Sequence, residues 1–404
     1  MSNKELFSIA LGLEEPWFVK EINFAPEKRR LDLLLDFKKG SKFACPECGA
    51  AGCAIHDTKE RTWRHLDFFQ HQAYLTARVP RIKCQTCGVK QVDVPWARKN
   101  TGFTLLFEIM VLHMAQHMAI QPLSVLVSVH MDSIWRILSH YVDQAHSEME
   151  LGEMRRVGID EFAKRTGHDY ATVFGDLDES RIVYISDGRK SNTVHEFANF
   201  LAQKGIPSLQ VQEICTDMWP AYMRGVRERF PDSTLVFDRY HVMTMVNRAV
   251  DLVRRHEAKE QEVLKKTRYL WLKNDDHLSK KQREQVEYIS RFNLKTARAY
   301  RIKEAIRQVW SFSNRDEAES HLKKWYFWAT HSRLDPIIDF AKTIKEHWNG
   351  ILNYFDSNIT NGIIEGINNK IKTALKRAYG FKSFRYLRTI VYLIAGKLAL
   401  PTRC

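Results

Sequence analysis

The 404-residue sequence contains no apolar run that approaches the ~18 residues of a membrane-spanning helix. Its first residues, Met-Ser-Asn-Lys-Glu-Leu, lack the apolar core of a secretory signal, and no internal repeat or low-complexity tract is evident. These absences favour a cytoplasmic protein with no membrane partner. What is present is an ordinary globular composition, with 44% hydrophobic and 27% charged residues. The length suits about two to four domains.

Acidic residues are too few to balance the basic ones. The chain has 48 Asp and Glu against 62 Lys and Arg, which gives a formal net charge of +14 and a pI of about 9.4. Such an excess suits a polyanionic partner, and nucleic acid is the usual one. General basicity without a partner is the alternative, and it is weakened because the Lys and Arg residues lie beside particular motifs.

Cysteine is scarce, with seven residues, but four of them form two Cys-x-x-Cys-Gly pairs, Cys45 with Cys48 and Cys84 with Cys87. In a reducing compartment this spacing indicates a metal site and not disulfides. Four thiolates form a closed, tetrahedral, structural Zn²⁺ site; four unrelated reduced cysteines are the alternative. Two spare candidate ligands, expected to be bystanders because the second pair completes the site, are Cys53 and His56.

The region between the cysteine pairs combines basic and aromatic residues on a strand-like segment, Tyr74–Ile82, and in the preceding Arg-Thr-Trp-Arg-His run. Such residues on a rigid ribbon suit contacts with DNA phosphates. A solvated basic face is equally compatible with the pattern. Within an N-terminal zinc-ribbon DNA-binding domain of residues 1–100, the candidate DNA contacts are Arg61, Arg64, Arg78 and Arg81.

Residues 101–150 predict three helices, over Phe103–His117, Gln121–Val127 and Met131–Ala145. Helix, short helix, tight turn and longer helix is the helix-turn-helix pattern, although any small three-helix bundle resembles it. Asp132 or Ser133 is expected to cap the third helix. The exposed side of that helix should carry Ser133, Arg136 and His140, and we take Ser133 and Arg136 as candidate DNA contacts.

Residues 151–240 alternate strand-like and helical segments in the order strand, strand, strand, helix, strand, helix, strand. The first strand, Arg155–Phe162, carries Asp160 near its exit, and the fourth, Val211–Asp217, ends in a second acid. An Asp at a strand end is by itself more often a surface residue. However, this element order is that of the ribonuclease H fold, in which strands one and four are neighbours, so Asp160 and Asp217 are expected to meet. The remaining segments are Tyr170–Gly175, Arg181–Ser186, Thr193–Lys204, a helix ending at Phe230, and Thr234–Phe237 before Asp238.

Residues 241–350 differ from the rest, because they are poor in Gly and carry dense Lys and Arg clusters in a mostly helical pattern. We interpret them as a large all-α insertion. A basic run on a helix is usually a solvated face, and scattered tryptophans are more often core residues than base-stacking platforms. The tryptophans of this segment are Trp271, Trp310, Trp325, Trp328 and Trp348.

Residues 351–404 return to the core with a helix predicted over Ser357–Lys376, which we expect Gly380 to end. One face of this helix is apolar, and another carries a polar stripe that begins near Glu365. One end of the stripe suits a metal, through Glu365, and the other suits a phosphate backbone, through Lys372 and Lys376. The apolar face holds Ile364, Ile367, Ile371 and Leu375, and the stripe holds Asn361, Glu365, Asn368, Lys372 and Lys376.

With these motifs in place, the sequence resembles bacterial insertion-sequence transposases of the ISL-three family over almost the whole chain. The resemblance is carried by the cysteine pairs, Val-Gly-Ile-Asp160-Glu, Thr-Asp217-Met-Trp-Pro-Ala-Tyr and Phe-Asp238-Arg-Tyr-His241-Val. It also rests on Thr360-Asn-Gly-Ile-Ile-Glu365-Gly-Ile-Asn-Asn-Lys-Ile-Lys and on the closing Ala-Tyr379-Gly-Phe-Lys-Ser-Phe stretch. Tyr240 is a small departure, because the family often has Phe there, but the ring is kept.

The resemblance implies an α+β multidomain transposase in which a zinc ribbon and a helix-turn-helix recognise the element's terminal inverted repeats. It implies a ribonuclease H-like α/β catalytic core with a DDE triad of Asp160, Asp217 and Glu365. Cleavage by water and joining of the new 3′-hydroxyl to target DNA would use two Mg²⁺ ions ~3.5–4 Å apart, held by carboxylates and bridged by Asp160. Asp238 and His241 would support these ligands or cap the next helix. We expect a homodimer on double-stranded DNA, associated with the bacterial nucleoid.

Two other functions stay open at this point. The main one is a zinc-dependent DNA-binding regulator with a non-catalytic core, and the complete set of acids argues against it. The second is a ribonuclease H-type nuclease that acts on RNA–DNA hybrids. Such an enzyme would not need two DNA-binding modules ahead of its core.

Overall fold

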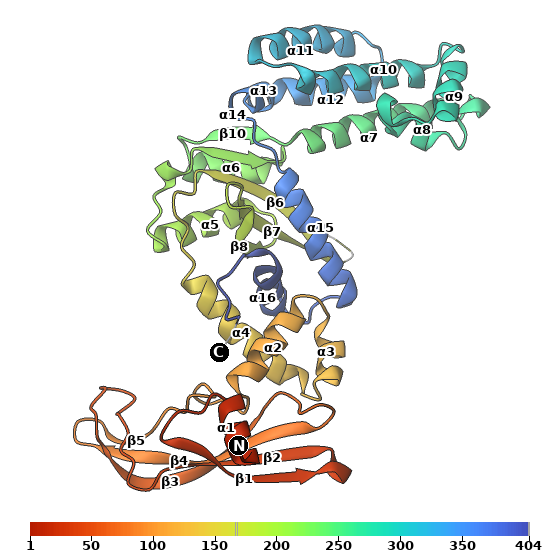
Figure 1. Cartoon of the computed structure of the whole chain (residues 1–404). Helices are drawn as coiled ribbons and strands as arrows, with labels where there is room; N and C mark the ends of the chain where they lie inside the picture. Colours follow the sequence, from red (N-terminus) through yellow and green to blue (C-terminus); the bar gives the residue numbers. More distant parts are fainter. Residues whose placement is uncertain (166, 168, 403–404) are drawn as a thin grey trace. The chain divides into compact units, whose positions relative to one another are not determined.

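The computed structural model describes residues 1–165, 167 and 169–402, and Figure 1 shows its elements. The chain divides into two compact units: unit 1 is residues 1–145 with the C-terminal segment from Ala399, and unit 2 is residues 146–398. The predicted turn from Arg165 to His168 lies partly outside the described residues. Among the helices that the structure describes, none combines the length and the apolarity needed to cross a membrane.

Unit 1 begins with a helix, α1 (Asn3–Ala10), and continues as a five-stranded sheet in the order β1-β2-β4-β3, with β5 paired to β4. β2 and β4 are parallel, and the other pairs are antiparallel. Alternate residues of β2 and β4 point into the core, where Leu33 lies opposite Leu75 and Trp63 is buried. The strands are β1 (Trp17–Ala25), β2 (Arg30–Phe37), β3 (Ala54–Arg64), β4 (Gln72–Cys84) and β5 (Gly88–Gln91).

Three helices follow this sheet, as predicted: α2 (Leu105–Ala115), α3 (Ile120–Leu126) and α4 (Met131–Ser147). Each begins and ends within two residues of its predicted bounds. The predicted cap of α4 is wrong, because Asp132 and Ser133 lie inside its first turn. The residue ahead of the helix is His130, and its ring Nδ1 accepts a hydrogen bond from the Asp132 amide at 3.3 Å.

A buried carboxylate ties these helices to the segment that precedes them. Glu108 of α2 is 0% exposed. It accepts hydrogen bonds from Arg98 Nε at 2.8 Å, from Thr101 Oγ1 at 2.6 Å and from the Tyr141 hydroxyl at 2.8 Å. Because a buried charge is tolerated only when donors satisfy it, this network holds α2, α4 and the incoming chain in one arrangement.

Unit 2 contains a second five-stranded sheet, in the order β10-β9-β6-β7-β8 (Figure 1). β6, β7 and β8 form an antiparallel meander, whereas β9 and β10 run parallel to β6. The predicted pairing of the first strand with the fourth is therefore confirmed. The strands are β6 (Arg156–Arg165), β7 (Asp169–Asp176), β8 (Arg181–Asp187), β9 (Glu213–Thr216) and β10 (Thr234–Phe237).

One face of this sheet packs against α5 (Ser191–Gln203) and α6 (Pro220–Arg229). Val157 and Ile159 of β6 are both fully buried in this core. Phe174 of β7 stacks on Phe197 of α5, with 4.4 Å between ring centroids. Alternation along β6 therefore leaves Gly158 and Asp160 for the opposite face.

That opposite face receives α15 (Gly362–Arg377), which packs on β6, and α16 (Phe384–Ala395), which packs on β8. Two strand glycines lie under α15. A Cβ atom on Gly158 would lie 2.7 Å from Ile364 Cγ1, and one on Gly175 would lie 2.1 Å from Ile364 Cδ1. The missing side chains therefore let the helix approach the strands closely.

Between β10 and α15 the chain is helical (Figure 1). The helices share a core in which Trp271 and Trp325 are buried, and their indole N–H groups donate to Thr267 Oγ1 at 3.0 Å and to the Ile302 carbonyl at 2.9 Å. These two tryptophans are core residues, as expected. The helices are α7 (Arg239–Glu257), α8 (Arg268–Leu272), α9 (Lys280–Ser290), α10 (Lys295–Arg307), α11 (Arg315–Thr330), α12 (Asp335–Glu346), α13 (Trp348–Leu352) and α14 (Tyr354–Ser357).

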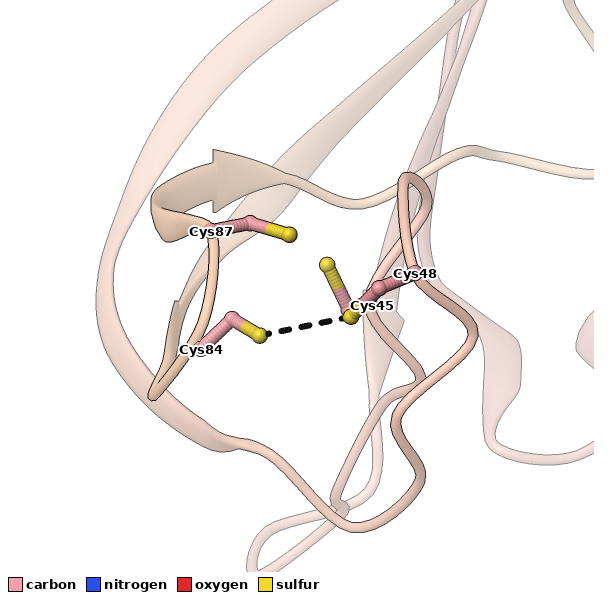
Figure 2. Close-up of side chains that lie close together, drawn as sticks. All are labelled: Cys45, Cys48, Cys84 and Cys87. Carbon is pink, nitrogen blue, oxygen red and sulfur yellow. Dashed lines mark hydrogen bonds between the residues drawn. The ribbon is translucent and has the colours of Figure 1, made fainter.

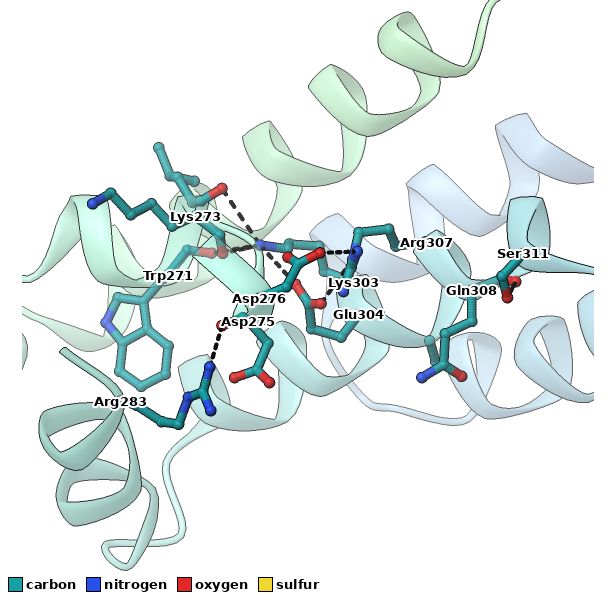
Figure 3. A network of polar contacts seen from close by, with 12 residues as sticks. Trp271, Lys273, Asp275, Asp276, Arg283, Lys303, Glu304, Arg307, Gln308 and Ser311 are labelled. Atoms are coloured by element: carbon teal, nitrogen blue, oxygen red, sulfur yellow. Dashed lines mark hydrogen bonds and ion pairs between the residues drawn. The ribbon is translucent and has the colours of Figure 1, made fainter. Parts of the chain in front are cut away.

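A polar network lies inside this helical segment (Figure 3). Lys303 of α10 is 0% exposed, and its ammonium donates to the carbonyls of Trp271 at 3.2 Å and Lys273 at 2.6 Å. The carboxylate of Glu304 lies 3.1 Å from the same ammonium and 2.9 Å from Arg307 Nε. Carbonyls at a helix end carry partial negative charge, so the buried lysine fastens the end of α8 to α10.

The end of α15 differs from its prediction by one residue. The sequence predicts that Gly380 ends the helix, but the left-handed residue just past the helix is Tyr379, with φ of 53°, and Gly380 follows with φ of 93°. The Tyr379 amide donates to the Lys376 carbonyl at 3.2 Å, and the Gly380 amide donates to the Leu375 carbonyl at 3.0 Å. This pair of bonds is a Schellman motif in which Tyr379 takes the place that glycine usually holds.

Candidate functional site

Four thiols converge in unit 1, as the two Cys-x-x-Cys-Gly pairs predict (Figure 2). Their sulfur atoms all lie within 4.8 Å of one another, and the Sγ atoms of Cys48 and Cys84 are 3.6 Å apart. Behind each pair a glycine adopts a positive φ, 72° at Gly49 and 76° at Gly88, which closes the tight turn. The four residues are Cys45, Cys48, Cys84 and Cys87.

The surroundings of these thiols suit a zinc ion. Backbone amides of Cys87 and Thr86 lower the pKa of the Cys84 thiol to about 6, which favours its thiolate, whereas the Cys48 thiol and burial raise the pKa of Cys87 to about 12. Opposite shifts of this kind are expected for crowded thiols that share their protons when no cation is bound. Zn–S bonds of about 2.3 Å place the sulfurs of a tetrahedral site about 3.8 Å apart, close to the observed spacing. Cys53 stays outside the cluster, where its thiol donates to the Ala50 carbonyl at 3.4 Å. The four cysteines therefore support a structural zinc site that needs neither Cys53 nor His56.

Arg64 is not available as a DNA contact, and its prediction as one is wrong. Its side chain is 6% exposed, and it pairs with Asp67 and donates to the Ala73 carbonyl at 3.2 Å. The guanidinium also lies over the ring of Phe107, 5.3 Å from its centroid. Its hydrogen-bonding capacity thus serves the fold of unit 1.

The other three candidate arginines of unit 1 keep part of their surface exposed, each with an internal partner. Arg78 donates to both carboxylate oxygens of Asp36 at 2.9 Å, and Arg81 Nε donates to Asp57 at 2.6 Å. Arg61 donates to a backbone carbonyl at 3.3 Å. The Arg81 pair is exposed on both sides and stabilises little, whereas the carboxylate of Asp36 is buried and Arg78 satisfies its charge. A guanidinium has five N–H donors and binds phosphate as readily as carboxylate. These residues therefore stay candidate contacts.

The outer face of α4 carries the predicted helix-turn-helix residues. Arg136 and His140 are exposed and Ser133 is half-buried. Arg136 Nη2 donates to Ser133 Oγ at 2.9 Å, so the two candidate contacts form one polar patch. The opposite face of α4 is buried through Ile134 and Leu138. α4 thus has one polar face exposed to solvent, and its opposite face is packed in the core of unit 1.

In unit 2, three carboxylates lie where the parallel pairing of adjacent strands ends. Asp217 and Asp238 follow β9 and β10, and Asp160 lies within β6, two residues beyond the last residue that pairs with β9. β6 pairs with β9 up to Gly158 opposite Cys215, and continuing this register by two residues places Asp160 opposite Asp217. β10 pairs with β9 in the same direction and is followed at once by Asp238, whose amide donates to the last residue of β9 at 3.0 Å. The three acids are therefore at the same level of the sheet.

Burial and mutual repulsion raise the pKa values of these acids. The pKa of Asp217 rises to about 6, because burial disfavours the charged form and the nearby Glu161 adds negative charge. Burial is also the main cause of the raised pKa values of Asp160 and Asp238, with the Glu365 charge adding to the rise for Asp238. Crowded carboxylates of this kind are a favourable environment for a divalent cation.

Glu161 belongs to this group and was missed by the sequence analysis. Strand alternation directs it away from Asp160, yet its charge acts on Asp217, and Arg189 Nη1 lies 3.7 Å from its Oε1. β9 accompanies β6 only as far as Gly158, so Glu161 lies beyond that pairing. Its position next to Asp160 in the motif was the only sequence signal.

His241 lies among the acids in the first turn of α7. Its Nδ1 is 3.7 Å from Asp217 Oδ2, and its charge opposes the rise in pKa of Asp160, Asp217 and Asp238. Asp238 occupies the N-cap position of α7 but makes no capping hydrogen bond with its side chain. Burial raises its pKa, and His241 and the Tyr240 amide partly offset this rise. The sequence leaves two roles open for Asp238 and His241, which are support of the metal ligands and capping of the next helix. The positions of the two residues are compatible with both roles.

α15 brings Glu365 to the same end of the sheet. Asn361 Nδ2 donates to the Ile159 carbonyl at 2.9 Å, and Asn368 Nδ2 donates to Asp160 Oδ2 at 2.7 Å. Residues 361, 365 and 368 share one helical face, so Glu365 projects between two side chains that contact β6.

The predicted division of α15 into an apolar face and a polar stripe needs correction. Asn361 and Asn368 are 2% and 1% exposed and belong to the docking surface, together with Ile364. Lys372 and Lys376, further along the stripe, are exposed. The helix is therefore docked by both apolar and amide side chains at its start and is free for solvent or DNA on its lysine-bearing side.

The carboxylates do not form one tight ligand cluster. Within residues 1–165, 167 and 169–402, only the four cysteines bring three or more potential ligand atoms all within 4.8 Å of one another. A two-ion site does not require such closeness, because ions about 3.5–4 Å apart take ligands from different sides. The donors are all carboxylate oxygens, the kind that Mg²⁺ prefers.

Comparison with known protein families gives three matches that together span most of the chain. Residues 157–391 match a model described as transposase, and residues 92–142 match the helix-turn-helix domain of transposase family ISL3. Residues 41–87 match the zinc finger of the transposases of IS204, IS1001, IS1096 and IS1165.

Whole-chain similarity points the same way. The transposase for insertion sequence element IS1557 of Mycobacterium tuberculosis is 27% identical over 443 aligned residues, covering 100% of this chain and 98% of that protein. The transposase for insertion sequence element IS1001 of Bordetella parapertussis is 25% identical over 387 residues, covering 93% of this chain and 95% of that protein. The similarity thus extends well beyond the region of any single motif.

Proposed function

The chain belongs to transposase family ISL3, and we propose on that basis that it binds the terminal inverted repeats of an insertion sequence and catalyses DNA strand cleavage and strand transfer. The family matches and the relatives support an insertion-sequence transposase that binds DNA. The observation that supports the finer proposal is that Asp160, Asp217 and Asp238 lie at the same level of adjacent strands, where α15, which also carries Glu365, is bonded to Asp160 through Asn368.

We assign the catalytic triad to Asp160, Asp217 and Glu365 on a ribonuclease H-like core with a helical insertion. The strand order, an antiparallel meander followed by two parallel strands, supports this core. Two Mg²⁺ ions bound by the triad would activate the attacking oxygen and stabilise the leaving oxygen of each displacement. The chain itself positions the central ligand, since Asn368 and the Glu161 amide each hold one oxygen of Asp160 at 2.7 Å.

We assign the DNA contacts to exposed basic and polar residues on both units. Lys372 and Lys376 on α15 suit the phosphate backbone near the cleaved bond, because the helix that carries them begins at the carboxylates. Because the two ends of an element are processed together, we expect a homodimer in the DNA complex. The terminal repeats would be contacted by Arg61, Arg78, Arg81, Ser133 and Arg136.

The triad assignment predicts three inactive variants that still bind DNA. Glu365→Gln, Asp160→Asn and Asp217→Asn should bind the element's ends normally but lose Mg²⁺-dependent cleavage and joining by roughly a thousandfold or more, because the ligands act as a unit. Binding is measured by mobility shift and cleavage with an end-labelled duplex that carries one end of the element.

Asp238→Asn is the matched control, since it removes a carboxylate at the same level of the sheet. It should keep measurable cleavage in a correctly folded protein. An inactive Asp238→Asn beside an active Glu365→Gln would show that the triad is assigned wrongly. The rival functions are tested with the wild type: a regulator would bind the ends without cutting them, and a ribonuclease H-type nuclease would cut an RNA–DNA hybrid in preference to them.

A further inference from the structure

The chain beyond the candidate triad carries charge of one sign only. From Gly366 to Cys404 the sequence contains no Asp or Glu and nine Lys or Arg residues. α15 leads from the carboxylates into this region, with Lys372 and Lys376 exposed along it, and Lys382 is exposed just after its end. Such a surface suits a polyanion and repels basic partners.

Tyr379 lies at the end of that helix and is 100% exposed. Its φ of 53° is in the left-handed region, which bulky residues rarely adopt and which glycine usually supplies at this position. Within the part of the chain that the structure describes, its ring lies against no other ring and no cation. The left-handed conformation closes α15 through the Schellman hydrogen bonds, but a glycine would close it with less strain. The tyrosine ring itself adds no packing, so its presence at a strained, exposed position points to a binding role.

We infer that Tyr379 is a DNA-binding residue that stacks its ring on, or inserts it between, bases of a duplex whose backbone lies along Lys372 and Lys376. The inference rests on the proposed function. At 1.5 Å per residue, α15 places Tyr379 roughly 20 Å beyond Glu365. That length corresponds to about six base pairs at 3.4 Å each. Stacking on an aromatic ring tolerates any base, so Tyr379 positions the DNA without reading its sequence.

The test is Tyr379→Gly in the full-length protein. Glycine adopts the same φ without strain, so the thermal midpoint should stay the same or rise, whereas loss of the ring should weaken binding of an end-bearing duplex about fivefold or more. Tyr379→Phe keeps the ring and should bind within about twofold of wild type. The matched control is Asn293→Gly, which relieves an exposed residue with φ of 50° in the turn between α9 and α10 and should leave binding unchanged.

A photo-reactive benzoylphenylalanine at position 379 locates the contact. It should crosslink to DNA about six base pairs from the cleaved bond. Wild-type affinity in Tyr379→Gly, or crosslinks only to protein, would overturn the inference and indicate a protein contact in its place. If wild type neither binds nor cuts the ends, the proposed function fails separately, and Tyr379→Gly is then compared with wild type on an unrelated duplex, where unchanged affinity overturns the inference.

Discussion

His65 is a titratable residue of unit 1 that the fold keeps neutral. Its Nδ1 lies 2.9 Å from Thr104 Oγ1, and burial together with the Arg64 charge lowers its pKa to about 4. An unfolded chain accepts this proton near pH 6.5, so the folded state is the weaker proton acceptor. Neutral His65 therefore makes its full contribution to the unfolding free energy above about pH 6.5, and this contribution is lost as the pH falls toward 4.

His65→Gln should flatten the acid side of the stability profile. Between about pH 7.5 and 5, the wild type should lose about 2 kcal/mol of unfolding free energy through this residue, and the variant should not. Urea unfolding of both proteins at the two pH values measures the difference, with zinc content followed because acid also displaces metal from thiolates in each. Parallel profiles of the two proteins would contradict the low pKa of His65.

At the scale of single residues, the spacing of residues along the chain predicts the zinc ligands well, but it predicts poorly which side chains are buried and what they contact. The four cysteines converge as expected because each pair is closed by its own short turn. Arg64 and Glu161 were misjudged for the opposite reason. Whether a guanidinium is buried depends on carbonyls such as that of Ala73, and whether a carboxylate joins a site depends on where the neighbouring strand stops.

At the scale of elements, the position of α15 decides whether Glu365 reaches the other acids. Gly158→Ala should disturb it, since the added Cβ would lie 2.7 Å from both Asn361 Oδ1 and Ile364 Cγ1. We expect the unfolding free energy to fall by about 1–3 kcal/mol, as for other overpacked sites. Cleavage should fall more than DNA binding, because the helix carries a proposed ligand.

Gly366→Ala is the control for this change. Gly366 is next to Glu365 on the same helix, but nothing lies within 4 Å of a Cβ added there. Alanine in a helix interior is favoured over glycine by about 0.5–1 kcal/mol, so this variant should be as stable as wild type or more so, with full cleavage. Equal loss of cleavage in both variants would argue against the docking of α15 as the cause. Unfolding curves and single-turnover cleavage provide the comparison.

The elements themselves were largely predictable, and the reasons for the exceptions are local. The strand predicted over Thr234–Phe237 coincides with β10. The helix predicted from Ser357 begins at Gly362, because Asn358 adopts a left-handed φ of 57° that breaks it from α14. The roles of Asn361 and Asn368 on α15 were not visible in the sequence, since their partners lie on β6, far away along the chain. Helical periodicity separates apolar from polar residues but not bonded amides from solvated ones.

At the scale of the whole molecule, we assign recognition of the element's ends to unit 1, and the chemistry together with non-specific DNA contacts to unit 2. Unit 1 holds the four thiols and the helix-turn-helix, whereas unit 2 holds the carboxylates and most of the acid-free segment, including Lys372 and Lys376. Loss of one unit should therefore affect sequence-specific and non-specific DNA binding differently. Loss of unit 1 should remove the preference for the element's ends, and the remaining basic surface should bind any duplex with a steep dependence on salt.

Zinc removal tests this division in the intact chain. Cys48→Ser or Cys84→Ser breaks a closed four-thiolate site, and structural zinc contributes folding free energy directly, so the variants should lose bound zinc and the preference for end-bearing over random duplex. Residual binding should fall steeply between low and high salt. Cys53→Ser is the control, because its thiol is not one of the four clustered thiols and donates to the Ala50 carbonyl, so it should keep both zinc and preference. The measurements are metal analysis and the affinities for end-bearing and random duplex. A structural role of zinc would be refuted by a wild type that has all four thiols intact but holds no zinc, or by a Cys84→Ser protein that still prefers the ends.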